Sequence, residues 1–252
     1  MLINIVSAAS VLLIVFGSIG GVIWAAQKFH WDKRIIVAGA TAFIASQVVH
    51  LPLNWGLGQM GWLGATLPLS NLDALILGLT AGLCEELARY GAMRWWVSEV
   101  RDVSKASGFG LGHGGIEALL IGILGCFSII NMIALQTMDL STLGLEPAQL
   151  EMVEQQVLSF QEQPFWQPML SFVERSMAVI NHVWMSVLVM VSLARNQVRW
   201  LVAAILWHTL INASAVMVLR DHGALATEAA LFACTLLAIF GWRSLRDTAA
   251  QG

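Results

Sequence analysis

The segment Leu72–Met93 reads LDALILGLTAGLCEELARYGAM, an apolar run that carries Glu85, Glu86 and Arg89 within a single helical turn. One charged side chain near the middle of a bilayer costs about 2.5–3.5 kcal/mol on insertion scales. Membrane proteins keep such groups where they face the interior of a helix bundle and take part in chemistry or ion movement. We therefore expect this segment to be a membrane helix whose charged turn belongs to a functional site.

The composition of the whole chain agrees with a membrane location. Of its 252 residues, 58% are hydrophobic and only 12% are charged, whereas a typical soluble domain is about 25% charged. Seven apolar stretches are long enough to cross a hydrocarbon layer of about 30 Å as helices. The sequence predicts an all-α, polytopic bundle of about seven transmembrane helices, with residues 1–252 as one domain. The expected spans are Ile3–Gln27, Ile35–Asn54, Leu72–Met93, Gly108–Leu135, Gln167–Leu193, Trp200–Leu219 and Ala224–Trp242.

Basic residues are distributed unevenly between the loops. They follow the first, third, fifth and seventh spans, whereas the long loop Gln136–Phe165 contains no Lys or Arg. By the positive-inside rule, we expect a plasma-membrane protein with its N-terminus outside and its C-terminus in the cytoplasm. Apolar and acidic residues recur at helical spacing over Glu146–Gln163, which predicts an amphipathic helix on the outer surface. Membrane lipid is the expected surrounding, and no basic patch indicates nucleic-acid binding.

Ionisable residues on four of the expected spans fall at similar depths. Counting 1.5 Å per residue from the nearest cytoplasmic basic residue places Glu85, Glu86, His113 and His208 roughly 12–14 Å deep. The same count places His182 roughly 20 Å deep. Because the spans alternate in direction, we expect these five side chains to meet in one cavity in the cytoplasmic half of the bundle.

Local spacing connects further polar residues to this site. Arg89 lies one turn after the two acids and can pair with either of them on a helix. Glu117 follows His113 by four residues, and Asn212 follows His208 by four. Polar residues near the outer ends of their spans are expected to be structural or interfacial; they are His50, Asn54, Glu174 and Arg175.

These residues, in this order, resemble the motifs of the type II CAAX-processing and bacteriocin-processing intramembrane proteases. The fuller set resembles the YhfC branch of that superfamily and covers residues 80–213. CAAX-type enzymes have three residues between the acidic pair and the arginine, whereas this chain has two, which weakens the expectation of a prenylated substrate. The motifs are Glu85-Glu86-x-x-Arg89, Phe109-x-x-x-His113 followed by Glu117, Glu174-Arg175 followed by His182, and His208-x-x-x-Asn212.

The resemblance implies hydrolysis of peptide bonds in or beside the membrane by an activated water. Glu85 would be the general base, and His113 would help to hold the water. Arg89 would keep part of the acidic pair ionised, while Glu86 would position Arg89 or share a proton with Glu85. The substrate would be a peptide or a transmembrane protein.

The resemblance also implies groups that stabilise the transition state. His208 and Asn212 would donate hydrogen bonds to the oxyanion of the tetrahedral intermediate. His182 would be a further donor, or a ligand if a metal is bound. The leading interpretation is a glutamic-type protease that needs no metal cofactor.

Three alternatives stay open at the level of sequence. Zinc would be held by Glu85, His113, His182 and His208, although the helical HExxH signature of zinc proteases is absent. A proton-coupled transporter would also bury Glu, His and Arg, but the repeated halves that transporters show are not evident. The third alternative is a membrane scaffold without enzymatic activity.

Overall fold

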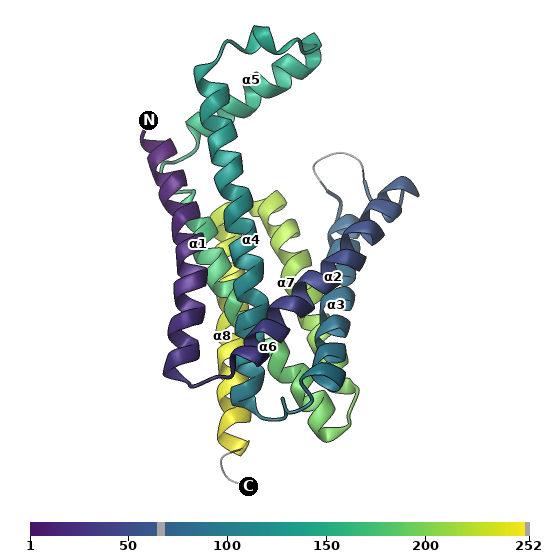
Figure 1. Cartoon of the computed structure of the whole chain (residues 1–252). Coiled ribbons are helices and arrows are strands. Elements are labelled where there is room, and N and C mark those ends of the chain that lie inside the picture. The colour runs from purple at the N-terminus through teal and green to yellow at the C-terminus, as the bar shows by residue number, and fades with distance from the viewer. Residues whose placement is uncertain (65–68, 250–252) are drawn as a thin grey trace.

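The computed structural model of the chain describes residues 1–64 and 69–249, and the regular elements within these ranges are all helices. Figure 1 shows a helical bundle with α5 standing beyond one end of it. The elements are α1 (Leu2–Lys28), α2 (Lys33–Gln59), α3 (Asn71–Gly91), η1 (Ala92–Trp96), α4 (Val103–Thr137), η2 (Leu140–Leu143), α5 (Pro147–Glu162), α6 (Met169–Arg195), α7 (Arg199–His222) and α8 (Ala224–Ala249).

Six helices in the described part of the chain are long and apolar enough to cross a membrane, namely α1, α2, α4, α6, α7 and α8. The predicted polytopic helical membrane bundle is thereby confirmed. Helix α3, the seventh expected span, is less apolar because it carries Asp73, Glu85, Glu86 and Arg89. It nevertheless packs inside the bundle against α2 and α7. The number of spans and the sidedness of the termini stay predictions.

Polar side chains and special backbone conformations define the helix ends. Ser70 and Asp73 form a capping box that begins α3, and the Asp102 side chain accepts a hydrogen bond from the backbone at the start of α4. Such caps satisfy backbone N–H groups that have no partner inside the helix. Helix α6 ends at Asn196 with φ of 50°, and α7 ends at Gly223 with φ of 79°. Local side chains and backbone conformations therefore determine where α3 and α4 begin and where α6 and α7 end.

Glycine residues bring the site helices into close contact. A Cβ at Gly112 of α4 would lie 2.0 Å from the backbone oxygen of Ile36 in α2, and one at Gly110 would lie 2.7 Å from the backbone oxygen of His182 in α6. A Cβ at Gly82 of α3 would lie 2.8 Å from the backbone oxygen of Ile205 in α7. Small residues of this kind allow membrane helices to approach closely. They bring the polar faces of α3, α4, α6 and α7 together.

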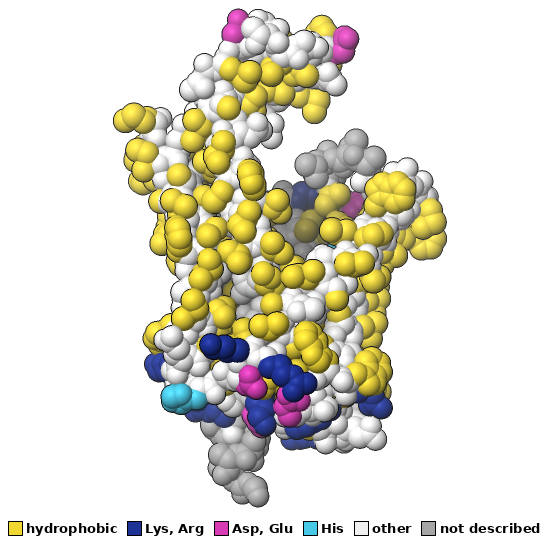
Figure 2. Space-filling model, in the orientation of Figure 1, with side chains coloured by type: hydrophobic (Ala, Val, Ile, Leu, Met, Phe, Trp, Pro, Cys, Tyr) yellow, Lys and Arg dark blue, Asp and Glu magenta, His cyan; other side chains and the backbone are white. Residues whose placement is uncertain are grey.

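The outer surface separates into an apolar region and charged ends. In Figure 2 hydrophobic side chains cover the middle of the visible face, and Lys and Arg gather at the end opposite α5. Helix α5 has no buried residue, and its bounds lie within one residue of the amphipathic helix expected over Glu146–Gln163. The bundle therefore presents an apolar exterior to lipid while its ionisable groups are gathered elsewhere.

Candidate functional site

The charged turn of α3 is enclosed by the bundle. Glu86 and Arg89 have no exposed surface, and Glu85 is only 5% exposed. Nε of Arg89 lies 3.0 Å from Oε2 of Glu86. Nη1 of Arg89 donates hydrogen bonds to the backbone oxygen of His182 at 2.8 Å and to the hydroxyl of Ser186. Arg89 therefore balances Glu86 and connects α3 to α6.

Histidines from three other helices surround the same turn. Nε2 of His113 lies 3.0 Å from Oε2 of Glu85, and Nδ1 of His208 lies 2.9 Å from Oε1 of Glu86. The ring of His182 lies between these two histidines, with centroid distances of 4.9 Å to His113 and 5.5 Å to His208. The five side chains that were expected to meet in the cytoplasmic half of the bundle are thus joined into one connected cluster.

A second layer of charges continues from His182. Nε2 of His182 lies 2.5 Å from Oε2 of Glu117, and Nη1 of Arg175 donates to Oε1 of Glu117 at 2.9 Å. Arg175 also pairs with its neighbour Glu174. Glu174 and Arg175 were expected to be structural charges near the outer interface, but the structure joins them to the candidate site through Glu117.

Residues of α2 also reach the site, and the sequence interpretation had left them out. Nε2 of Gln47 donates to Oε1 of Glu85 at 3.3 Å, and Oε1 of Gln47 lies 3.2 Å from Nδ1 of His50. This series of hydrogen bonds continues from His50 to Asn54 at 2.9 Å, and Thr80 donates a hydrogen bond to Asn54 at 2.8 Å. His50 and Asn54 are therefore linked to Glu85 instead of being isolated at the interface. The i, i+3, i+7 spacing of the three α2 residues was the signal that could have identified this polar face.

The polar side chains border a small enclosed space. A cavity of about 80 Å³ is lined by Glu85, Glu117, His182, His208 and Asn212. Asn212 was expected beside His208, and the cavity brings it to the same space as the two carboxylates. The cavity can hold water molecules in contact with several acceptors and donors, as a hydrolytic site requires.

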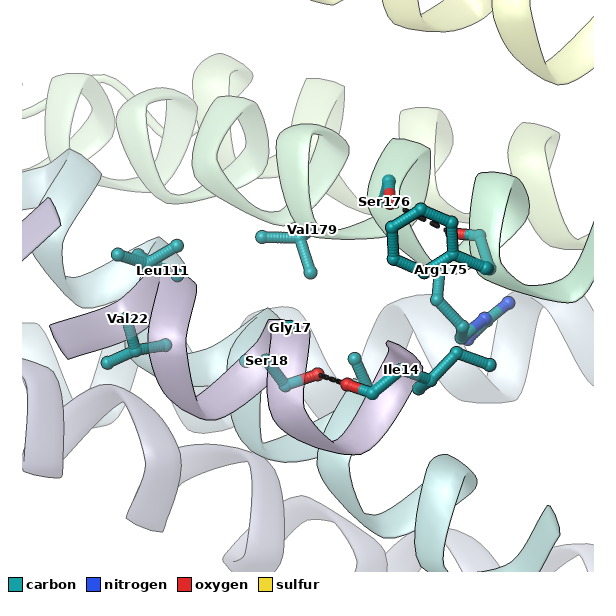
Figure 3. Close-up of a pocket in the computed structure, with 12 residues that line it drawn as sticks. Ile14, Gly17, Ser18, Val22, Leu111, Arg175, Ser176 and Val179 are labelled. Atoms are coloured by element: carbon teal, nitrogen blue, oxygen red, sulfur yellow. Dashed lines mark hydrogen bonds between the residues drawn. The ribbon is translucent and has the colours of Figure 1, made fainter. Parts of the chain in front are cut away.

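A larger cavity lies on the opposite face of α4. It measures about 260 Å³ and is bordered by α1, α4 and α6 (Figure 3). Its lining is apolar apart from Ser18, Ser176 and Arg175. Arg175 lines both cavities, but of the two only the smaller is lined by imidazole groups and carboxylates, which belong to His182, His208, Glu85, Glu117 and Glu174. We therefore assign the candidate site to the smaller cavity.

The donor atoms fit a divalent cation. One ligand atom each from Glu85, His113 and His182 lie within 4.8 Å of one another, and two imidazoles with one carboxylate form a known catalytic zinc set. Nδ1 of His182 faces the guanidinium of Arg89 at 3.1 Å, and Nε2 faces Glu117, so both of its nitrogens are engaged. His208 is better placed than His182 to bind a metal. Its Nδ1 is hydrogen-bonded to Glu86, and its Nε2 faces Oε2 of Glu85 at 3.9 Å.

The formal charge of this network also suits a cation. Four carboxylates and two guanidinium groups are linked through the ion pairs, which leaves a charge of −2 when the carboxylates are ionised and the histidines are neutral. Glu174 is 37% exposed, so water screens part of this charge, but the more deeply buried groups still leave excess negative charge, which is costly in an apolar bundle. A divalent cation would neutralise it. The groups counted are Glu85, Glu86, Glu117, Glu174, Arg89 and Arg175.

Comparison with known proteins places the chain in a family. A model of the family described as YhfC intramembrane metalloprotease matches residues 10–233. The chain belongs to the YhfC family. It is 29% identical over 216 residues to the uncharacterized membrane protein YhfC of Bacillus subtilis (strain 168), a match that covers 82% of each chain. No solved structure matches the chain.

The family description changes the expected chemistry of the site. The resemblance drawn from the motifs is confirmed, since the matched residues include every motif residue from Glu85 to Asn212. The description names a metalloprotease, so the preference for a glutamic-type enzyme without a metal cofactor is not supported. The sequence argument gave too much weight to the missing HExxH signature, which requires both histidines on one helix. The donors in this fold come from separate helices.

Proposed function

We propose that this YhfC-family chain is a membrane-embedded metalloprotease that hydrolyses peptide bonds of polypeptides within or beside the membrane. The observation that carries the proposal is the position of Glu85, which lines a small cavity together with His208 and contacts His113 through Oε2 at 3.0 Å. Burying these groups in an apolar bundle is expensive, which favours a functional reason for keeping them. The net charge of −2 and the donor set favour a metal site over a purely structural network.

Glu85 and His113 of the clustered donor set are proposed ligands. His208 is proposed as the third ligand in place of His182, because both nitrogens of His182 are engaged by Arg89 and Glu117. A divalent cation of the zinc type held there would supply a Lewis acid that polarises the peptide carbonyl and acidifies a water molecule. Glu86 accepts the Nδ1 proton of His208, which leaves Nε2 unprotonated and directed at the ligand site. A carboxylate behind a ligating histidine fixes the tautomer and orientation of the ring. Arg89 in turn keeps Glu86 ionised and in place.

Glu117 is the proposed proton carrier. Its carboxylate lines the cavity beside Glu85 and is held on one oxygen by Arg175 and on the other by His182. It accepts a proton at Oε2 when water attacks the peptide carbon, and it gives that proton to the nitrogen of the departing amine as the C–N bond breaks. His182 orients this carboxylate, because Nδ1 faces Arg89 and Nε2 therefore carries the proton that faces Glu117.

Asn212 is the proposed oxyanion donor. It borders the cavity one helical turn from His208 on α7. An amide N–H in such a cavity can donate to the oxygen that becomes negative in the tetrahedral intermediate. The role assigned to Asn212 by the motif resemblance is thus retained, while His208 moves from oxyanion donor to ligand.

Proteolysis can be tested without knowing the natural substrate. The purified chain is reconstituted in liposomes with a set of quenched fluorogenic transmembrane peptides, and cleavage is followed by fluorescence and mass spectrometry. We expect cleavage by the parent chain and loss of cleavage to background in Glu85→Gln, which keeps the shape but removes the carboxylate proposed to bind the metal. Arg94→Gln, an exposed substitution in η1, serves as the control. Absence of cleavage with every peptide, in a folded and metal-loaded preparation, would favour a scaffold or a transporter.

A further inference from the structure

A second polar cavity lies at the end of the bundle nearest α5. It measures about 190 Å³ and is lined mainly by the beginnings of α6 and α8 and the end of α7. Because α6 follows α5 directly and the three helices alternate in direction, these ends lie together on the side expected to be outside. The polar residues in its lining are Gln163, Gln167, Ser171, Glu174, Thr227 and Glu228.

The two polar cavities meet at one side chain. Glu174 lines the outer cavity together with Glu228, and it also lines the site cavity together with Glu85 and Glu117. Carboxylates therefore follow one another from the outer end of the bundle to the candidate ligand site. Oε2 of Glu228 is buried and has no hydrogen-bond partner among the residues that the structure describes, so it is available to water or to a passing cation.

The charged side chains along this route are mainly acidic. Arg175 is the only Lys or Arg that lines either polar cavity in the described part of the chain, and it is already paired with Glu117 and Glu174. A narrow space lined by one sign of charge concentrates the opposite sign by about 10-fold or more. The larger cavity of Figure 3 has an almost wholly apolar lining and offers no comparable path for water.

We propose that the space between α6, α7 and α8 is the passage through which water and divalent cations enter the site from the outer side, with Glu228 and Glu174 as its entrance. The inference rests on the proposed function, because hydrolysis consumes one water per peptide bond and the apolar exterior supplies none. It adds a second role to Glu174, which selects cations at the boundary between the two cavities.

Cysteine labelling tests the passage without requiring proteolysis. In a chain whose Cys84, Cys126 and Cys234 are replaced by alanine, Ala178→Cys places a thiol in the site cavity. Ile180→Cys is the matched control, since it lies two residues away on α6, about 3 Å along the axis, and its side chain is exposed on the bundle surface. The thiolate is the reactive form and needs water to exist.

The probes are membrane-impermeant thiosulfonate reagents of either charge, added to one side of oriented membranes. We expect reagent added outside to modify Ala178→Cys and not Ile180→Cys. After correction for their reactivity with a free thiol, the cationic reagent should react about 10-fold faster than the anionic one. Glu174→Gln combined with Glu228→Gln should bring that ratio close to one. Ala215→Cys, which reaches the same cavity from α7, provides a second position if the first variant fails to fold.

Two results would overturn the passage. One is modification of Ala178→Cys and Ala215→Cys only from the cytoplasmic side, and the other is no modification from either side in a folded chain. Outside labelling of a chain that cleaves no peptide would refute the proposed protease and leave the passage intact. Cleavage without outside labelling would refute the passage alone.

Discussion

Helices α3 and α5 both carry several acidic residues, yet only α3 builds a site. In α3, Glu85 and Glu86 are buried, and each is in contact with a histidine from another helix. In α5, Glu151 and Glu154 are exposed, and the helix has no buried residue. The comparison indicates that enclosure in an apolar segment, and not the number of acidic residues, brings such residues into contact with partners from other helices. Partners from distant segments then become obligatory, because a buried charge without one is unstable.

The largest effect on the difference between α3 and α5 is expected from a substitution of Arg89, the arginine of α3. Arg89→Met leaves Glu86 buried without its cation, and breaking a buried pair in this way costs about 3–5 kcal/mol. Arg94→Met is the matched control, because Arg94 is exposed one turn later. Denaturant unfolding in detergent should show a large loss of stability for the first variant and none for the second. Equal stability of the two variants would mean that burial around α3 is looser than the structure indicates.

The proposed proton carrier gives the next largest effect. Glu117→Gln keeps the hydrogen bond from Arg175 but cannot accept a proton, so turnover should fall by about 100-fold or more. The metal content should stay unchanged, since Glu117 is not a proposed ligand. Measuring both quantities on one preparation separates this role from metal binding. Loss of metal with Glu117→Gln would make Glu117 a ligand, contrary to the assignment.

An identical donor and acceptor pair occurs in both regions and sharpens the comparison. Nε2 of Gln47 donates to Glu85 at 3.3 Å in the bundle, and Nε2 of Gln155 donates to Glu151 at 3.3 Å on exposed α5. Gln47→Leu removes a bond to a buried charged group and should cost about 1.5–3 kcal/mol in stability. Gln155→Leu should change stability by less than about 0.5 kcal/mol. Similar losses of stability for the two substitutions would show that burial does not increase the contribution of this hydrogen bond.

The smallest effect is expected on α5 itself. Replacing Glu151 and Glu154 together by glutamine should alter the free energy of unfolding by no more than about 0.5 kcal/mol, because solvent already screens both charges. Peptide cleavage by the reconstituted chain should be unchanged. A marked loss of cleavage with intact stability would instead assign α5 a role in binding the substrate.

The sequence predicted the part of the site that ionisable residues make visible. Charged residues inside apolar runs are rare, so Glu85 and His113 stood out, and counting along the helices placed them at one depth. The depth of a residue in the membrane does not show which side of its helix the residue faces, however. Gln47 and Thr80 are uncharged and cost little in an apolar run, so they did not stand out in the sequence. The spacing of Gln47 with His50 and Asn54 was the available signal, and the packing of α2 against α3 shows that these side chains point inward.

The expectation that no metal cofactor is needed is not supported by the family description, for a related reason. Ligand signatures in sequence rely on fixed spacing along one helix, whereas the proposed ligands Glu85, His113 and His208 lie on three separate helices. Only the assembled bundle reveals that Nδ1 of His208 lies against Glu86 and that four carboxylates and two guanidinium groups form one network.

The most direct test of the account is the metal content of the purified chain. Elemental analysis of the parent protein should find about one divalent metal per chain, and Glu85→Gln, His113→Ala and His208→Ala should each lose it, whereas Arg94→Gln should retain it. Removal of the metal by a chelator should abolish cleavage of the reconstituted peptides, and its return should restore cleavage. Full cleavage by a chain that contains no metal, with Glu85→Gln inactive, would contradict the metal assignment and favour Glu85 as the base.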